Sequence, residues 1–105
     1  MQQIRPHELK AWLAEGGQPQ LLDVREDWEF QTARIESSTL IPMGEVVGRI
    51  TELDPAKEIV VICHHGARSM RVAGYLEQQG FARVYNLAGG VDAWARAVDP
   101  EMRVY

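Results

Sequence analysis

Residues 58–62 constrain the fold most, because they read Glu-Ile-Val-Val-Ile, with four β-branched residues in a row. Such a run suits a strand that is covered on both faces, as the central strands of parallel sheets are. A helix is expected next, over about residues 69–79. Val72, Ala73 and Leu76 recur there at helical spacing. A buried strand that leads into a helix is the repeating unit of α/β proteins.

The rest of the chain shows the same alternation of short apolar strands and helical patterns. Further strands are expected at residues 21–24, 39–41 and 83–87, and further helices after Pro6, at 26–33, around 46–50 and from Gly89-Gly90 onward. At 105 residues the chain has the common size of one domain. The sequence therefore predicts an α/β fold, a parallel sheet with helices on both faces, in a single domain over residues 1–105.

The net charge and the single cysteine limit the functions that this chain can have. The net charge of −4 disfavours nucleic acid as a partner, because binding to the phosphate backbone needs a basic surface. No apolar run is long enough for a membrane span or a signal peptide, so we expect a cytoplasmic protein without a membrane partner. The single cysteine excludes an internal disulfide and a Cys-x-x-Cys zinc site.

Cys63 opens the segment with the most chemical content, which reads Cys-His-His-Gly-Ala-Arg-Ser over residues 63–69. It lies between the buried strand and the next helix, where unpaired N–H groups and the helix dipole favour an anion. A tight loop with Gly66 can turn successive N–H groups inward. Arg68 adds a permanent positive charge. We therefore expect Cys63 to form its nucleophilic thiolate readily.

Simpler interpretations of these residues remain open. Cys63 alone could be a small apolar residue at the end of a strand. His64 and His65 suggest a metal, but three consecutive residues can hardly present three ligands to one ion, so no metal or other cofactor is expected. One of these histidines could steer an anion, or both could face solvent.

Asp23 and Arg25 follow another expected strand and so lie at the same carboxyl edge of the sheet, where ligands bind in such folds. They could support the cysteine loop or meet a substrate. The alternative is a structural ion pair between Arg25 and Glu29, which have helix-like i,i+4 spacing.

Several segments together resemble one known family. The stretches CHHGARS, GYLEQQGF and NLAGGVDAW, preceded by LLDVREDWEF and IPM, are similar in order and content to single-domain rhodaneses. The tail that ends at Tyr105 is similar to the end of rhodanese domains fused to E1-like adenylating enzymes, which deliver sulfur to ubiquitin-like carriers. The proline that such tails usually carry near the final tyrosine is absent here.

The resemblance implies a sulfurtransferase with a rhodanese-like fold. Thiosulfate or a persulfide donor would load a sulfur atom onto Cys63, and cyanide, a thiol or an acceptor protein would remove it. The loop formed by His64, His65, Gly66, Ala67, Arg68 and Ser69 would hold the persulfide, with Asp23 and Arg25 in support. Because no second cysteine can attack the persulfide, the sulfur must leave with an external acceptor, so we expect an open loop mouth.

Two other functions are compatible with the resemblance. One is a non-enzymatic regulatory or sulfur-sensing module. The other is a phosphatase or arsenate reductase, whose loops in this family read Cys-x5-Arg and fit a tetrahedral oxyanion. Here the spacing is Cys63-x4-Arg68, the shorter sulfurtransferase form.

Overall fold

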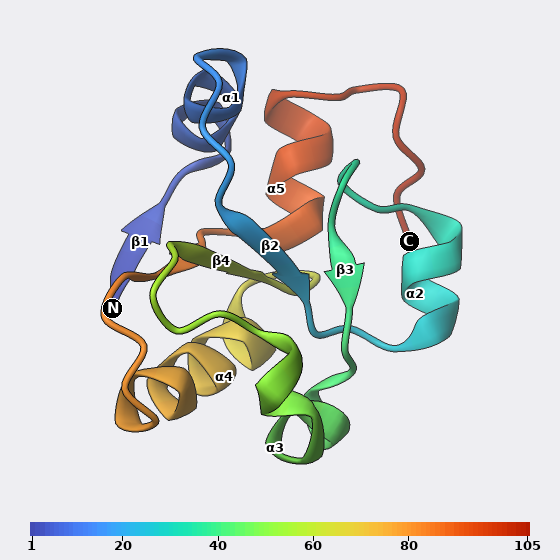
Figure 1. Ribbon diagram of the computed structural model, residues 1–105. Helices are drawn as coiled ribbons and strands as arrows, with labels where there is room; N and C mark the ends of the chain where they lie inside the picture. Colours follow the sequence, from blue (N-terminus) through green and yellow to red (C-terminus); the bar gives the residue numbers. More distant parts are fainter.

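The computed structural model describes residues 1–105 and contains one sheet of five strands, all parallel, in the order β1-β5-β4-β2-β3 (Figure 1). The strands are β1 (Gln2–Ile4), β2 (Gln20–Asp23), β3 (Thr39–Leu40), β4 (Ile59–Ile62) and β5 (Val84–Leu87). The parallel α/β fold expected from the sequence is confirmed.

Helices cover both faces of this sheet (Figure 1). They are α1 (Pro6–Ala14), α2 (Asp27–Thr32), α3 (Val46–Arg49), α4 (Ala67–Gln78) and α5 (Gly90–Ala97), and short 3-10 turns flank α3. Helices α1 and α5 pack on one face, and α3 and α4 pack on the other. None of the helices is both long and apolar enough to cross a lipid bilayer.

Strand β4 lies in the middle of the sheet and separates two hydrophobic cores. Ile59 and Val61 belong to the core under α4, whereas Val60 and Ile62 belong to the core under α1 and α5. Successive side chains of a strand point to opposite faces, so a strand covered on both sides needs apolar residues throughout. This arrangement explains the unbroken β-branched run.

Two elements differ from the sequence expectation by more than one residue at a boundary. Strand β1 was not expected, because its three residues are mostly polar and only Ile4 is buried. It forms an edge of the sheet by pairing with β5. Helix α4 begins at Ala67, two residues before the expected start, so Arg68 and Ser69 belong to its first turn.

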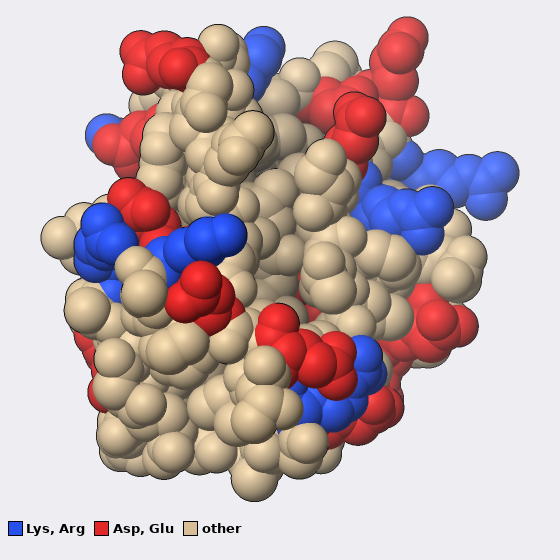
Figure 2. Space-filling view, in the orientation of Figure 1, with Lys and Arg blue, Asp and Glu red and all other residues tan.

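Acidic and basic side chains alternate on the face of the molecule seen in Figure 2, without a large continuous area of either charge. This mixed surface agrees with the small net charge of −4.

Candidate active site

Cys63 follows β4 directly and its side chain is almost completely buried, with 1% of the residue exposed. The Gly66 N–H donates a hydrogen bond of 3.0 Å to the Cys63 sulfur. Gly66 has a φ of +107°, a left-handed conformation that few other residues adopt, and it precedes the first turn of α4. The glycine thus allows the chain to turn sharply enough to bring a backbone donor onto the sulfur. The open loop mouth expected from the sequence is not present, since the sulfur lies beneath the surface.

The start of α5 holds the same loop from the other side. The N–H groups of Val91 and Asp92 donate to the carbonyl oxygens of Cys63 and His64, at 2.8 and 3.0 Å. The two chains approach so closely that a Cβ on Gly90 would lie 2.3 Å from the Cys63 oxygen. Because C=O and N–H point in opposite directions across a trans peptide, the following two N–H groups of the loop point away from α5.

Ser69 and Asn86 form a buried polar group behind the sulfur. The Ser69 hydroxyl lies 3.3 Å from the Cys63 sulfur and also contacts the side-chain oxygen of Asn86. The Asn86 amide nitrogen donates to Gln3 at 2.9 Å and to the Gly66 carbonyl at 3.4 Å. Sequence reasoning missed Asn86 and Gln3, since neither is near Cys63 in the chain. Only the pairing of β5 with β1 and β4 brings them to this edge.

Arg68 turns out to be half of an ion pair. Its two terminal nitrogens donate to the two carboxylate oxygens of Glu29 at 2.7 and 2.8 Å. These bonds are the main cause that lowers the pKa of Glu29 to about 2 and raises that of Arg68. The positive charge that the sequence places beside Cys63 is therefore balanced by a carboxylate from α2.

Asp23 and Arg25 pair with each other, and both are fully buried. The Arg25 guanidinium donates to both carboxylate oxygens of Asp23, at distances between 2.8 and 3.1 Å. The ion pair between Arg25 and Glu29 considered from the sequence is wrong, because each residue has a different partner. Asp23 and Arg25 thus form a fully buried ion pair at the end of β2.

Tyr105 joins the two ion pairs. Its hydroxyl accepts a hydrogen bond of 2.6 Å from Arg25 and donates one of 3.0 Å to Glu29. Its ring packs against His64 with 4.2 Å between centroids, so the C-terminal tail lies over the cysteine loop beside α2 (Figure 1). Burial is the main cause that raises the pKa of Tyr105 to about 12.

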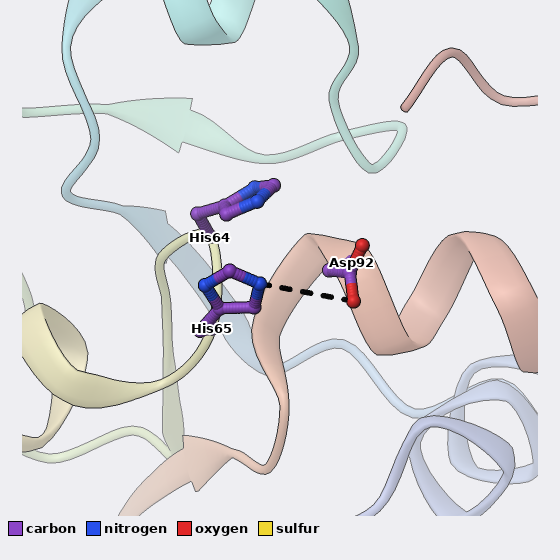
Figure 3. A group of neighbouring side chains, drawn as sticks. All are labelled: His64, His65 and Asp92. Carbon is purple, nitrogen blue, oxygen red and sulfur yellow. Dashed lines mark ion pairs between the residues drawn. The ribbon is translucent and has the colours of Figure 1, made fainter. Parts of the chain in front are cut away.

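His64, His65 and Asp92 meet at the surface of the loop (Figure 3). The His65 ring points toward Asp92 on α5, with 3.8 Å between nitrogen and oxygen. The potential ligand atoms of the three residues lie up to 4.8 Å apart, whereas ligands of one zinc ion lie about 3.4 Å apart. Asp92 also pairs with Arg96 at 3.1 Å. The Asp92 carboxylate is thus shared between His65 and Arg96.

Burial is the main cause that lowers the pKa of His64, so this ring is neutral at pH 7. Its Nδ1 atom is buried without a hydrogen-bond partner. His65 and Ala67 are exposed. With His64 neutral and Arg68 paired, the loop is less positive than its sequence suggests.

Comparison with known proteins identifies the family and the fold. Residues 5–97 match the sequence family described as "Rhodanese-like domain". The chain belongs to the rhodanese-like family. A rhodanese-like domain protein from Staphylococcus aureus has the same fold, with a TM-score of 0.85 and 34% identity over 90% of this chain and 91% of that one.

Two curated relatives of this rhodanese-like chain differ in length. A protein named "Sulfurtransferase" from Allochromatium vinosum is 36% identical over 90% of this chain and 88% of its own length. The "Probable adenylyltransferase/sulfurtransferase MoeZ" of Mycobacterium tuberculosis is 32% identical over 97% of this chain. The chain spans only 26% of that second protein, and 30% of a chloroplast relative from Arabidopsis thaliana.

Proposed function

We propose that this chain is a sulfurtransferase that carries sulfur as a persulfide on Cys63. The sulfur donor is thiosulfate or a persulfide, and the acceptor is a thiol or cyanide. The observation that carries this proposal is the position of the only cysteine, which lies between β4 and α4 with a backbone N–H 3.0 Å from its sulfur. A donor at this distance stabilises negative charge on sulfur.

The reaction divides into two balanced steps. In loading, the Cys63 thiolate attacks the outer sulfur of thiosulfate, the S–S bond of thiosulfate breaks, and sulfite leaves with the electron pair. In discharge, the acceptor attacks the outer sulfur of the persulfide, and Cys63 leaves as a thiolate. The sulfane sulfur keeps its oxidation state, so no redox cofactor is needed.

The surroundings of the loop favour a small sulfur donor over a phosphate ester. Arg68, which would have to bind a phosphate, donates both terminal nitrogens to Glu29 instead. The short Cys63-x4-Arg68 spacing supports the same choice.

The relatives suggest the kind of acceptor used in the cell. One is named a putative sulfur carrier protein, from Bacillus subtilis, and others combine adenylyltransferase with sulfurtransferase in their names. We therefore include a protein sulfur carrier, with a thiol or persulfide end, among the acceptors. Discharge to a protein requires its chain end to reach the Cys63 loop.

Intact-mass measurement after exposure to thiosulfate tests the proposal. The protein should gain one sulfur atom and lose it on addition of cyanide, with thiocyanate as the product. Cys63→Ser, which is nearly the same size, should fold and gain nothing. A protein that stays unmodified, or one whose Cys63→Ser variant still gains sulfur, would show that the proposal is wrong. Loading without discharge to any acceptor would instead indicate a sulfur-sensing module.

A further inference from the structure

The hydroxyl of Ser69 faces two hydrogen-bond acceptors, although it carries only one proton. One is the Cys63 sulfur at 3.3 Å, and the other is the side-chain oxygen of Asn86. Ser69 is completely buried and Asn86 is 1% exposed. Bulk solvent does not reach a site this buried, so the Ser69 hydroxyl has one proton to donate and these two acceptors beside it.

The orientation of the Asn86 amide follows from its other contacts. The Gly66 carbonyl, 3.4 Å from the amide nitrogen, can only accept a hydrogen bond. The NH2 group must therefore face Gly66, which leaves the amide oxygen facing Ser69. A second donated bond, to Gln3 at 2.9 Å, holds the same orientation. Asn86 can thus only accept from Ser69.

We propose that Ser69 is a catalytic residue whose hydroxyl changes its acceptor during sulfur transfer. While Cys63 is a thiol or a persulfide, Ser69 donates to Asn86. When the Cys63 sulfur becomes a thiolate, Ser69 donates to that sulfur. This inference rests on the proposed function, because the catalytic step is the formation of the thiolate during discharge.

The charge on the inner sulfur decides which acceptor is stronger. In the persulfide the negative charge resides on the outer sulfur, and the inner sulfur is a weak acceptor. During discharge, the acceptor thiolate forms a bond to the outer sulfur, the Cys63 S–S bond breaks, and its electron pair stays on the Cys63 sulfur. A hydrogen bond to a charged group is stronger than one to a neutral amide. Ser69 therefore stabilises the leaving thiolate by turning its hydroxyl toward it. The Gly66 N–H, in contrast, is fixed by the backbone and cannot change its acceptor.

The other ionisable groups around the loop keep their charge between about pH 7 and about pH 10, where a thiol ordinarily titrates. Glu29 and its partner Arg68 remain charged, since the pKa of Glu29 is lowered to about 2 and that of Arg68 is raised by their hydrogen bonds. Tyr105, with its pKa raised to about 12, and His64, with its pKa lowered, both stay neutral.

The remaining charged groups of the site are the Asp23–Arg25 pair at the end of β2 and the Asp92 carboxylate of α5, which faces exposed His65. The pKa of Asp92 is lowered, chiefly by its hydrogen bonds from Arg96, and that of Arg25 is raised by its pairing with Asp23 against the effect of burial, so both keep their charge in this range. The N-terminal residue Met1, whose amine pairs with Glu77, contacts Gln3, the partner of Asn86, so the same pH series on Cys63→Ser separates the part of the change that Cys63 causes.

Separate measurement of the two half-reactions tests the catalytic role. Ser69→Ala should slow single-turnover discharge to cyanide by about tenfold, as expected for a lost hydrogen bond to a charged group. Loading should fall by less, because the same hydroxyl stabilises the thiolate that attacks. Ser69→Thr keeps the hydroxyl and should restore discharge. Ser38→Ala, which removes a hydroxyl that donates to Ile35 before β3, is the matched control.

The change of acceptor is tested without any sulfur donor. The side-chain amide signals of Asn86, assigned in 15N NMR spectra by their loss in Asn86→Leu, should titrate together with the rate of Cys63 alkylation. In Ser69→Ala this titration should disappear, because the variant has no hydroxyl that could move from Asn86 to the Cys63 thiolate. An equal titration in Ser69→Ala, or discharge by that variant at the parent rate, overturns the proposal. Failure of the parent protein to gain sulfur overturns the proposed function alone, and the NMR titration still decides the behaviour of Ser69.

Discussion

The pair of Glu29 with Arg68 should be one of the largest single contributions to the stability of this protein. The Glu29 side chain is 5% exposed and accepts hydrogen bonds from both terminal nitrogens of Arg68. Its pKa falls from 4.5 to about 2, mainly because of Arg68. At roughly 1.4 kcal/mol for each pH unit, this difference corresponds to about 3 kcal/mol. Glu29→Gln should lose about 2 to 3 kcal/mol, since the amide oxygen still accepts one of these bonds.

Urea denaturation at pH 7 measures this loss. A domain of this size has a free energy of unfolding of roughly 5–15 kcal/mol, so the variant should still fold. Glu45→Gln is the matched control, because Glu45 is exposed and pairs with Arg49 at i,i+4. That surface pair should contribute little, so the denaturation midpoint of the control should stay close to the parent's.

The pH dependence gives a second test with a defined sign. Because the folded-state pKa of Glu29 is depressed, its stabilising effect is complete above about pH 4.5 and is lost as the pH falls toward 2. The difference in stability between the parent and Glu29→Gln should shrink by about 1.4 kcal/mol for each pH unit in this range. A difference below about 0.5 kcal/mol at pH 7, or one that does not change between pH 5 and pH 3, would refute this reasoning.

Three further changes have outcomes that the loop geometry sets. Gly90→Ala places a methyl group 2.3 Å from the Cys63 carbonyl at a φ of +62°, so thermal denaturation should show a loss of about 2 kcal/mol or more, with slower sulfur loading. Lengthening the loop by one residue between Cys63 and Arg68 should weaken thiosulfate turnover, while the parent protein should show negligible hydrolysis of aryl phosphates; strong phosphatase activity in the parent would contradict the argument from loop size. Tyr105→Phe removes a hydroxyl that links two ion pairs and should cost about 1 kcal/mol in urea denaturation, whereas no change would mean that the hydroxyl is equally well solvated in the unfolded chain.

The elements of the fold were predictable where the pattern was long or strongly apolar. Strand β4 and helix α4 follow from the β-branched run and the helical spacing after it. Strand β1 was not predictable, because only Ile4 in it is buried and its polar residues give no strand pattern. Its presence depends on pairing with β5, which lies far along the chain.

The candidate site was predictable only for the contiguous loop. Cys63 and Gly66 could be placed from the sequence, since a glycine between a strand and a helix indicates a tight turn at the sulfur. Glu29 and Asn86 could not, because their contacts with the loop come from α2 and β5. Residues 64–71 contain four basic side chains, His64, His65, Arg68 and Arg71, and no acid, and the fold brings carboxylates to this segment from α2 and α5.

The burial of Cys63 bears on how sulfur leaves this protein. Only 1% of the residue is exposed, so an acceptor has little access to its sulfur in the unloaded form. Loading adds a second sulfur about 2 Å beyond the first. The outer sulfur is the atom that the acceptor attacks, whereas attack on the inner sulfur would release the outer one as hydrosulfide and leave Cys63 in a mixed disulfide. Burial of the inner sulfur therefore favours productive transfer, and the absence of a second cysteine leaves that transfer to an external acceptor.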